Sequence, residues 1–177
     1  LTAHLDSISF DGDQAATLAP GADDNASGSA VLLAIAGLLA GQPSDYSLRL
    51  VWFTGEEFGY WGSKPYTSWL ASRNENILAA INVDMAGYDG NTDRVVELHT
   101  GVLDRNIRLG DYLAAANQLY GLNLLLERKT RSAAFFSDHR TFWDHGYTSL
   151  LVIENFFDDT AEFKRPPDRN PNYHKTT

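Results

Sequence analysis

The sequence predicts an α/β fold, a three-layer sandwich in which helices cover both faces of a mostly parallel mixed sheet. Segments with a strand pattern take turns with segments of helical periodicity along the chain, which is typical of this class. One central segment, "ILAAINVDM" (77–85), is nearly all apolar, as are strands buried on both faces of a parallel sheet. At 177 residues and 44% hydrophobic composition, the chain can form one domain with a sizeable core.

Six segments have the pattern of strands. The first resembles the end of a strand, and "YSLRLVWFT" (46–54) and the apolar run at 77–85 follow it. The turn "YDGNTD" (88–93) separates the third strand from the fourth. In chain order, the predicted strands are 1–5, 46–54, 77–85, 94–100, 122–127 and 148–155.

Four segments are predicted to be helices, namely 26–40, 63–73, 106–120 and 138–145. In the first, apolar residues fall at i, i+1, i+4, i+7 and i+8, and Gly41 and Pro43 end the helix. The third also has an apolar face. The residues expected to face the core are Val31, Leu32, Ile35, Leu38 and Leu39 in the first helix, and Ile107, Leu109, Leu113, Ala116 and Tyr120 in the third.

Charge and composition exclude several classes of partner. The net charge of -9 and the pI near 4.8 argue against nucleic acid and anionic membranes, which attract Lys and Arg clusters. No apolar run approaches the roughly 20 residues of a membrane span. The absence of cysteine excludes disulfides and thiolate metal sites. Because the chain begins at Leu1, in what resembles a strand, we expect residues 1–177 to be a single domain from a longer protein, incomplete at both ends.

Two adjacent carboxylates precede the first predicted helix, in the stretch "GADDNASGSA" (21–30). One aspartate would serve as an N-cap, but the second needs another partner. His4, "TGEE" (54–57) and Asp84 each follow a predicted strand, and His174 lies in the last loop. The carboxyl ends of strands are where open α/β sheets bind ligands. Imidazoles and carboxylates gathered there would repel one another without a cation, so the sequence predicts a metal site.

The ligand types indicate zinc. Nitrogen and oxygen ligands without sulfur suit Zn²⁺ in a catalytic site, and one bridging carboxylate would allow two metal ions to be held. The glutamate doublet then has two functions: Glu57 binds metal, while Glu56 points elsewhere and is free to take a proton from water.

Six motifs resemble, in order, those of the secreted two-zinc aminopeptidases. The same structural family includes glutamate carboxypeptidase, glutaminyl cyclase and the inactive transferrin-receptor ectodomain. The resemblance extends from residue 4 to residue 177 and implies the phosphorylase/hydrolase-like zinc peptidase fold. The motifs are "HLDS" (4–7), "PGADDNASGSA" (20–30), "WFTGEEFGYWGS" (52–63), "NVDMAGY" (82–88), "SDHRTF" (137–142) and "NPNYHKTT" (170–177).

The resemblance also implies a role for each polar residue. Glu56 would be the general base, and Tyr173 would hydrogen-bond the oxyanion. Asp6 would orient the first histidine. The residues themselves leave two roles open for Asp138, which either supports the metal ligands or caps a surface helix. The implied zinc ligands are His4 and Asp84 for one ion, Glu57 and His174 for the other, and Asp24 as the bridge between them.

This resemblance implies hydrolysis of the N-terminal peptide bond of peptides with a free N-terminus, by means of two zinc ions. It also implies a cis peptide bond between Asp24 and Asn25. Although the absence of cysteine fits any compartment, the resemblance to secreted enzymes favours an extracellular or periplasmic location. The sequence does not predict an oligomeric state.

Two other functions share parts of this pattern. A single-zinc glutaminyl cyclase would keep Asp24, Glu57 and His174, and a catalytically inactive binding domain would normally have lost ligands. The intact histidine of "HLDS", the stretch "TGEEFGYWGS" and the complete set of five ligands favour the aminopeptidase.

The remaining histidines and aromatics have simpler interpretations. His99, on a predicted strand, and His139 and His145, around the last predicted helix, are expected to be structural. Three aromatic residues could form the floor of a hydrophobic specificity pocket, namely Phe135, Phe136 and Trp143. Core packing is expected for at least two of them.

Overall fold

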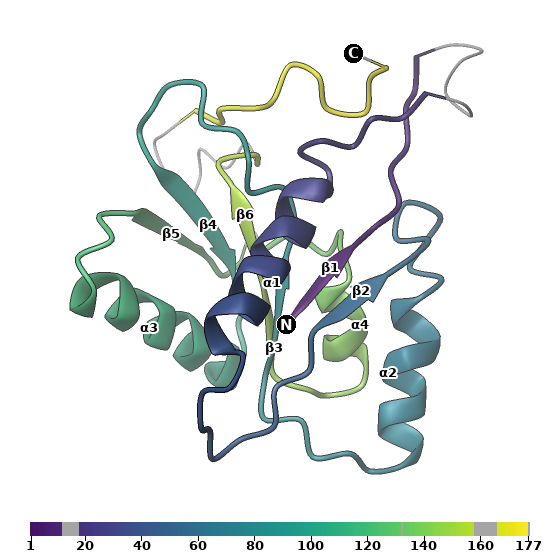
Figure 1. Ribbon diagram of the computed structural model, residues 1–177, viewed down its shortest axis with the longest axis vertical. Coiled ribbons are helices and arrows are strands. Elements are labelled where there is room, and N and C mark those ends of the chain that lie inside the picture. Colours follow the sequence, from purple (N-terminus) through teal and green to yellow (C-terminus); the bar gives the residue numbers. More distant parts are fainter. Residues whose placement is uncertain (12–17, 132, 158–165, 177) are drawn as a thin grey trace.

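A computed structural model describes residues 1–11, 18–131, 133–157 and 166–176. Six strands form one sheet in the order β2-β1-β3-β6-β4-β5 (Figure 1). All neighbouring strands are parallel except β4 and β6, which are antiparallel, so the sheet is mixed as predicted. The strands are β1 (Thr2–His4), β2 (Val51–Phe53), β3 (Ala80–Val83), β4 (Val95–His99), β5 (Leu125–Lys129) and β6 (Ser149–Glu154).

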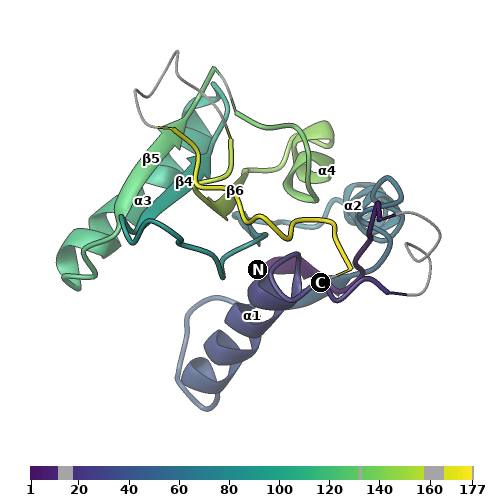
Figure 2. The same cartoon turned by 90° about the horizontal axis from the view of Figure 1, so that it is seen from above.

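Helices cover both faces of this sheet, which confirms the three-layer arrangement. Seen from above, α1 and α3 lie on one face and α2 and α4 on the other (Figure 2). The helices are α1 (Ala26–Leu39), α2 (Ser63–Ser72), α3 (Asp104–Leu119) and α4 (His139–Asp144). Within the described ranges, no helix is long and apolar enough to cross a lipid bilayer.

Two apolar clusters pack against the two faces of β1, β2 and β3. On one side, Leu32 of α1 packs with Ala3 and Val83, and Leu32 is completely buried. On the other side, α2 and α4 contribute to a cluster of Phe53, Leu70, Ala80 and Phe142. Burying an aliphatic side chain of this size contributes roughly 1.5–3 kcal/mol, so these clusters hold the layers together.

Several strands are shorter than or shifted from their predicted ranges. The strand predicted at 46–54 is formed only at Val51–Phe53, because its ladder with β1 covers only those three residues. The strand predicted at 77–85 narrows to Ala80–Val83, the stretch that pairs with β6. Strand β5 begins three residues later than predicted and extends to Lys129, in register with His99 of β4. Pairing with a partner, rather than apolar character alone, therefore sets the ends of these strands.

The predicted core faces of two helices are only partly correct. Leu38 and Leu39 are exposed because α1 leans away from the sheet towards its C-terminal end (Figure 2). Tyr120 follows the end of α3 and is also exposed. The buried positions of α3 are instead Asn106, whose side chain accepts a hydrogen bond from Ser149 N, and Gly110. A Cβ on Gly110 would lie 2.9 Å from Thr100 Cγ2, so this glycine allows close packing.

The start of α1 is fastened to the end of β3 by Asn25. Its buried side chain accepts hydrogen bonds from Gly28 N (2.9 Å) and Met85 N (3.2 Å) and donates one to Val83 O (3.0 Å). The first of these bonds is a helix N-cap. Asp24, on one side of this joint, and Asp84, on the other, are therefore brought together.

Gly28 is required at this joint, and Gly37 of the same helix is a matched control. A Cβ on Gly28 would lie 2.3 Å from Asn25 Oδ1 and 2.5 Å from Val83 O, whereas a Cβ on Gly37 meets no described atom within 4 Å. We expect Gly28→Ala to lower the free energy of unfolding by about 1–3 kcal/mol, and Gly37→Ala to raise it by up to about 1 kcal/mol. Urea denaturation of the full-length protein measures both, and equal effects would contradict the close packing at Gly28.

Candidate metal centre

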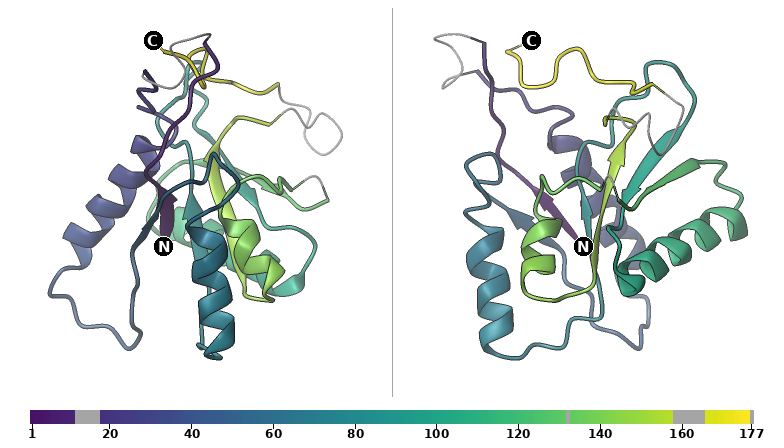
Figure 3. Two further views of the ribbon diagram at one scale, coloured as in Figure 1. Left: turned by 90° about the vertical axis from the view of Figure 1, so that its right-hand side faces the viewer. Right: turned by 180° about the vertical axis from the view of Figure 1, so that it is seen from behind.

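The candidate ligands gather at the carboxyl edge of the sheet. His4 is the last residue of β1, Asp84 follows β3 directly, and Glu57 lies in the loop after β2. Asp24 precedes α1, and His174 lies in the C-terminal segment, which passes over this edge of the molecule (Figure 3). Five residues far apart in the sequence therefore meet in the place that parallel sheets use for ligands.

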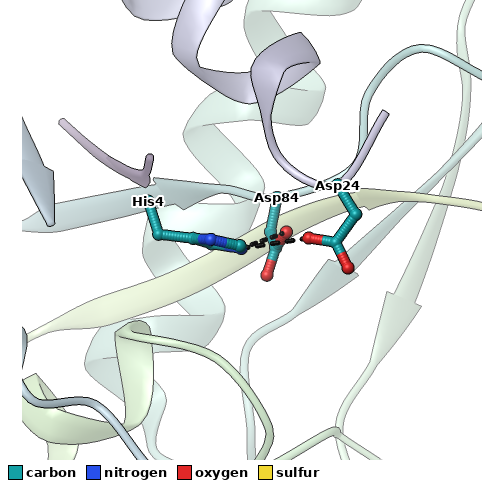
Figure 4. Close-up of side chains that lie close together, drawn as sticks. All are labelled: His4, Asp24 and Asp84. Atoms are coloured by element: carbon teal, nitrogen blue, oxygen red, sulfur yellow. Dashed lines mark hydrogen bonds and ion pairs between the residues drawn. The ribbon is translucent and has the colours of Figure 1, made fainter. Parts of the chain in front are cut away.

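The first group consists of His4, Asp24 and Asp84 (Figure 4). His4 Nε2 lies 3.1 Å from Asp24 Oδ1 and 3.2 Å from Asp84 Oδ1. The imidazole is 1% exposed, so water contributes little to the balance of charge around it.

The second group consists of Asp24, Glu57 and His174. His174 Nε2 lies 2.9 Å from Asp24 Oδ2 and 3.1 Å from Glu57 Oε1. Asp24 thus turns one carboxylate oxygen towards each histidine, and the two groups share this residue. The arrangement is the one expected of a carboxylate that bridges two cations.

Hydrogen bonds from the histidines can satisfy only some of these contacts. Each Nε2 atom carries at most one proton, yet each faces two carboxylate oxygens. The separations of 2.9–3.2 Å are close to the edge of a tetrahedron built on metal–ligand bonds of about 2.0–2.1 Å, which is about 3.3 Å. The donor set of both groups therefore fits a divalent cation of the zinc type.

The protonation of the histidines depends on these carboxylates. Burial disfavours the charged imidazole of His4, but its hydrogen bonds with Asp24 and Asp84 outweigh burial and raise its pKa to about 12. Burial likewise opposes the charge on His174, and its hydrogen bonds with Asp24 and Glu57 raise its pKa to about 9. In the absence of metal, protons on the histidines compensate part of the negative charge, and a cation must displace them.

Glu56 faces a cavity of about 330 Å³ beside both groups. Burial, followed by the charge of Asp84, raises its pKa to about 9. Tyr173 lines the same cavity, and its ring stacks on that of His174 with centroids 3.8 Å apart. Burial and the nearby carboxylates, Asp24 first, raise the pKa of Tyr173, so its phenol remains a proton donor. Glu56 and Tyr173 therefore face the same cavity beside the two ligand groups.

Asp6 supports the site differently from the sequence prediction. It lies beyond the end of β1, and its carboxylate accepts hydrogen bonds from Glu56 N and Glu57 N, both at 3.1 Å. The nearer partner of His4 Nδ1 is the main-chain oxygen of Asp6 at 3.0 Å, whereas the carboxylate is 3.7 Å away. The carbonyl thus fixes the histidine tautomer, because it accepts the Nδ1 proton and leaves Nε2 for a metal.

Ser137 is a supporting residue that the sequence reasoning missed. Its hydroxyl donates a 2.6 Å hydrogen bond to Asp84 Oδ2 and accepts one from Asn82 Nδ2 at 2.7 Å. Ser137 is part of the motif "SDHRTF", but a serine has no charge to mark it as a partner of a metal ligand, whereas the neighbouring Asp138 has one. Asp138 is completely buried beside the site, and burial raises its pKa to about 7 although the Ser63 hydroxyl opposes this change.

Other residues considered in the sequence lie outside the two ligand groups. Of the three aromatic candidates, Phe136 lines the cavity, whereas Phe135 packs edge-on against Trp143. His145 contacts Ser68, and His99 and His139 are buried. The bond between Asp24 and Asn25 is cis, which confirms that prediction.

Comparison with known proteins identifies the class. The model of Peptidase family M28 matches residues 1–177, and the chain belongs to this family. A probable leucine aminopeptidase of Arthroderma benhamiae is 31% identical over 164 residues, which cover 89% of this chain and 43% of that protein. Aminopeptidase YwaD of Bacillus subtilis is 29% identical over 86% of this chain and 31% of its own length. The chain thus spans less than half of these curated relatives.

Solved structures confirm the fold. A zinc aminopeptidase from Bacillus subtilis superimposes with a TM-score of 0.74 at 28% identity, over 99% of this chain and 38% of that one. An aminopeptidase from Aneurinibacillus sp. strain AM-1 gives a TM-score of 0.72 at 28% identity, over 99% of this chain and 36% of that one. The α/β architecture is therefore the zinc peptidase fold that the motifs imply.

The raised pKa values predict how stability depends on pH when metal is removed. His4, His174 and Glu56 have folded-state pKa values of about 12, 9 and 9, above their ordinary values of 6.5, 6.5 and 4.5. Each group therefore stabilises the fold fully below its ordinary value, and that contribution is lost as pH rises towards the folded-state value. We expect the Tm of chelator-treated protein to fall between about pH 6.5 and pH 9, as followed by thermal denaturation. A Tm that rises over this range would contradict the assignment.

Proposed function

We propose that the full-length protein is an aminopeptidase that uses two zinc ions. The observation that carries the proposal is the sharing of Asp24 by two complete ligand groups. His4 and Asp84 would hold one ion with Asp24, and Glu57 and His174 would hold the other. The aminopeptidase names of relatives and the zinc aminopeptidase from Bacillus subtilis support the same function.

Zinc ions would supply Lewis-acid polarisation of a peptide carbonyl and would acidify water. Glu56 would take the proton of the attacking water and pass it to the leaving amine. Asp6 accepts a hydrogen bond from Glu56 N, and Glu56 lines the cavity, so one carboxylate would make both proton transfers. The positive charge beside Glu56 would lower its raised pKa towards the range in which it accepts a proton at neutral pH.

Tyr173 would stabilise the oxyanion. Its pKa is raised, so the phenol keeps its proton and can donate a hydrogen bond to the negative oxygen that develops during attack. The stacking of its ring on His174 restricts the orientation of the hydroxyl.

The substrate would be a peptide with a free N-terminus. Its amino group would meet the carboxylates that surround the cavity, among them Asp24, Glu56 and Glu57. The apolar wall of the cavity would take the first side chain, and it is formed by Met85, Phe136, Ile153, Phe156 and Phe157. Acidic groups beside an apolar wall suit an amino-terminal residue better than an internal one.

Metal analysis tests the number of zinc ions. We expect the full-length protein to contain close to two zinc ions per chain by elemental analysis, and chelation to abolish aminopeptidase activity. Asp24→Asn should lose zinc from both positions, because Asp24 belongs to both groups. The neighbouring Asp23 belongs to neither group, so Asp23→Asn is the control and should keep its zinc. A protein that holds one zinc ion and cyclises glutaminyl substrates would favour the glutaminyl cyclase. An inert protein without metal would favour the binding domain.

The glutamate doublet provides a second test. Glu56→Gln keeps the shape of the side chain and removes the proton acceptor, so kcat should fall by about 10²- to 10⁴-fold while zinc is retained. Glu57→Gln should instead weaken zinc binding, because Glu57 is in the second ligand group. Steady-state kinetics with an aminoacyl-nitroanilide and zinc titration separate the two variants, and the reverse pattern would exchange their roles.

A further inference from the structure

A buried cluster of charged and polar residues lies outside the ligand groups, on the paired strands β4 and β5. Glu97 and His99 of β4 are in register with Glu127 and Lys129 of β5. All four are at most 6% exposed, and alternation along both strands places them on one face. Burying charged groups is costly unless they make specific bonds, so the bonds of this cluster indicate what it holds in place.

The ring of His99 is fixed in one tautomer by its two partners. Nδ1 accepts a 2.7 Å hydrogen bond from Ala134 N, so the ring proton is on Nε2. Nε2 then donates a 2.7 Å hydrogen bond to Glu97 Oε2. The main chain at Ala134 is also held from its other side, because Ala134 O accepts a hydrogen bond from His139 Nε2 at 3.0 Å.

Glu97 reaches a second segment through its other oxygen. Oε1 accepts a 3.1 Å hydrogen bond from Phe157 N, and Lys129 Nζ lies 3.8 Å from the same oxygen. The ring of Phe157 packs edge-on against that of His99, with centroids 5.0 Å apart. The buried Glu97–His99 pair thus connects the segment at 133–137 with the segment at 155–157.

Both segments contribute walls to the cavity beside the candidate metal centre. Phe136 belongs to the first segment, and Phe156 and Phe157 belong to the second. The first segment also contains Ser137, whose hydroxyl binds Asp84. The position of each wall therefore depends on a bond made by the Glu97–His99 pair.

We propose that Glu97 and His99 are positioning residues that set the separation of the two aromatic walls, and thereby the selectivity for the first side chain of the substrate. This inference rests on the proposed aminopeptidase function. Neither residue touches the substrate. They act through the main chain at Ala134 and Phe157, so their loss changes which side chains fit the cavity more than it changes the hydrolytic step.

Two substitutions of His99 separate its two bonds. In His99→Asn, the side-chain oxygen lies near the position of Nδ1 and can still accept the Ala134 N–H. In His99→Gln, the amide can reach Glu97, but no acceptor remains for Ala134. Glu97→Gln is a third variant, because His99 and Phe157 donate to different oxygens of Glu97 and an NH2 group that cannot accept replaces one of them. Thr67→Val is the control, since the hydroxyl of the buried Thr67 donates to carbonyls of its own helix α2 and, among the described residues, to no other group.

The experiment measures kcat/KM of the full-length, zinc-loaded protein for two substrates, leucine nitroanilide and alanine nitroanilide. We expect His99→Gln and Glu97→Gln to lower the leucine-to-alanine ratio of kcat/KM by about 10-fold, through KM for leucine, with zinc content and kcat for alanine retained. His99→Asn should stay close to the parent. In hydrogen-exchange mass spectrometry, segment 133–137 should exchange faster in His99→Gln but not in Thr67→Val.

A purely structural role gives a different result. The proposal is wrong if His99→Gln and Glu97→Gln lower the Tm as Thr67→Val does but leave the selectivity ratio unchanged. It is also wrong if His99→Asn and His99→Gln have the same selectivity ratio. If the zinc-loaded parent hydrolyses neither substrate, the proposed aminopeptidase function is wrong, but the positioning role can still be tested. Calorimetry then measures the affinities for leucine and alanine hydroxamates, whose ratio reports the selectivity without turnover. A ratio that is unchanged in the variants overturns the positioning role.

Discussion

The buried side chain of Asn25 is the constraint on which the site depends. It binds the start of α1 and the end of β3 together through three hydrogen bonds to main-chain groups. Asp24 and Asp84 are attached to these two ends, so their separation is set by backbone bonds rather than by mobile side chains. Because an unsatisfied buried amide would be costly, the joint is specific as well as strong. The first ligand group is therefore built at the ends of regular elements, which favours a preorganised site.

Burial of several carboxylates is the main electrostatic cost of this arrangement. Asp24, Glu57, Asp84 and Glu56 lie close together, and burial, followed by the charge of Asp84, raises the pKa of Glu56. The main-chain N–H groups that bind Asp6 and the hydroxyl of Ser137 offset part of the negative charge without competing for the ligand positions. A pair of divalent cations would offset the rest, which links the stability of this part of the fold to metal binding.

The two sides of the cavity are positioned by different chemistry. His4, Asp84 and Asp24 are held by the ends of β1 and β3 and by the joint at Asn25, whereas the aromatic walls follow segments that lack regular structure at 133–137 and 155–157. Such segments need side-chain bonds to keep one conformation. The buried Glu97–His99 pair supplies bonds to both segments, and Ser137 connects the first segment to the ligand Asp84.

The sequence by itself determined the α/β class, the order of the elements and the ligand candidates, because apolar periodicity and residue chemistry are local properties. His4, Asp24, Glu57, Asp84 and His174 were all recognised from their motifs, and the structure brings them together. Tertiary structure alone decided that the carbonyl of Asp6 accepts the histidine proton, that Ser137 binds Asp84 and that Leu38 remains exposed. Those features depend on which distant groups meet and on how far α1 leans from the sheet. Local patterns carry no information about such distances, because they are set by strand pairing and by the packing of the layers.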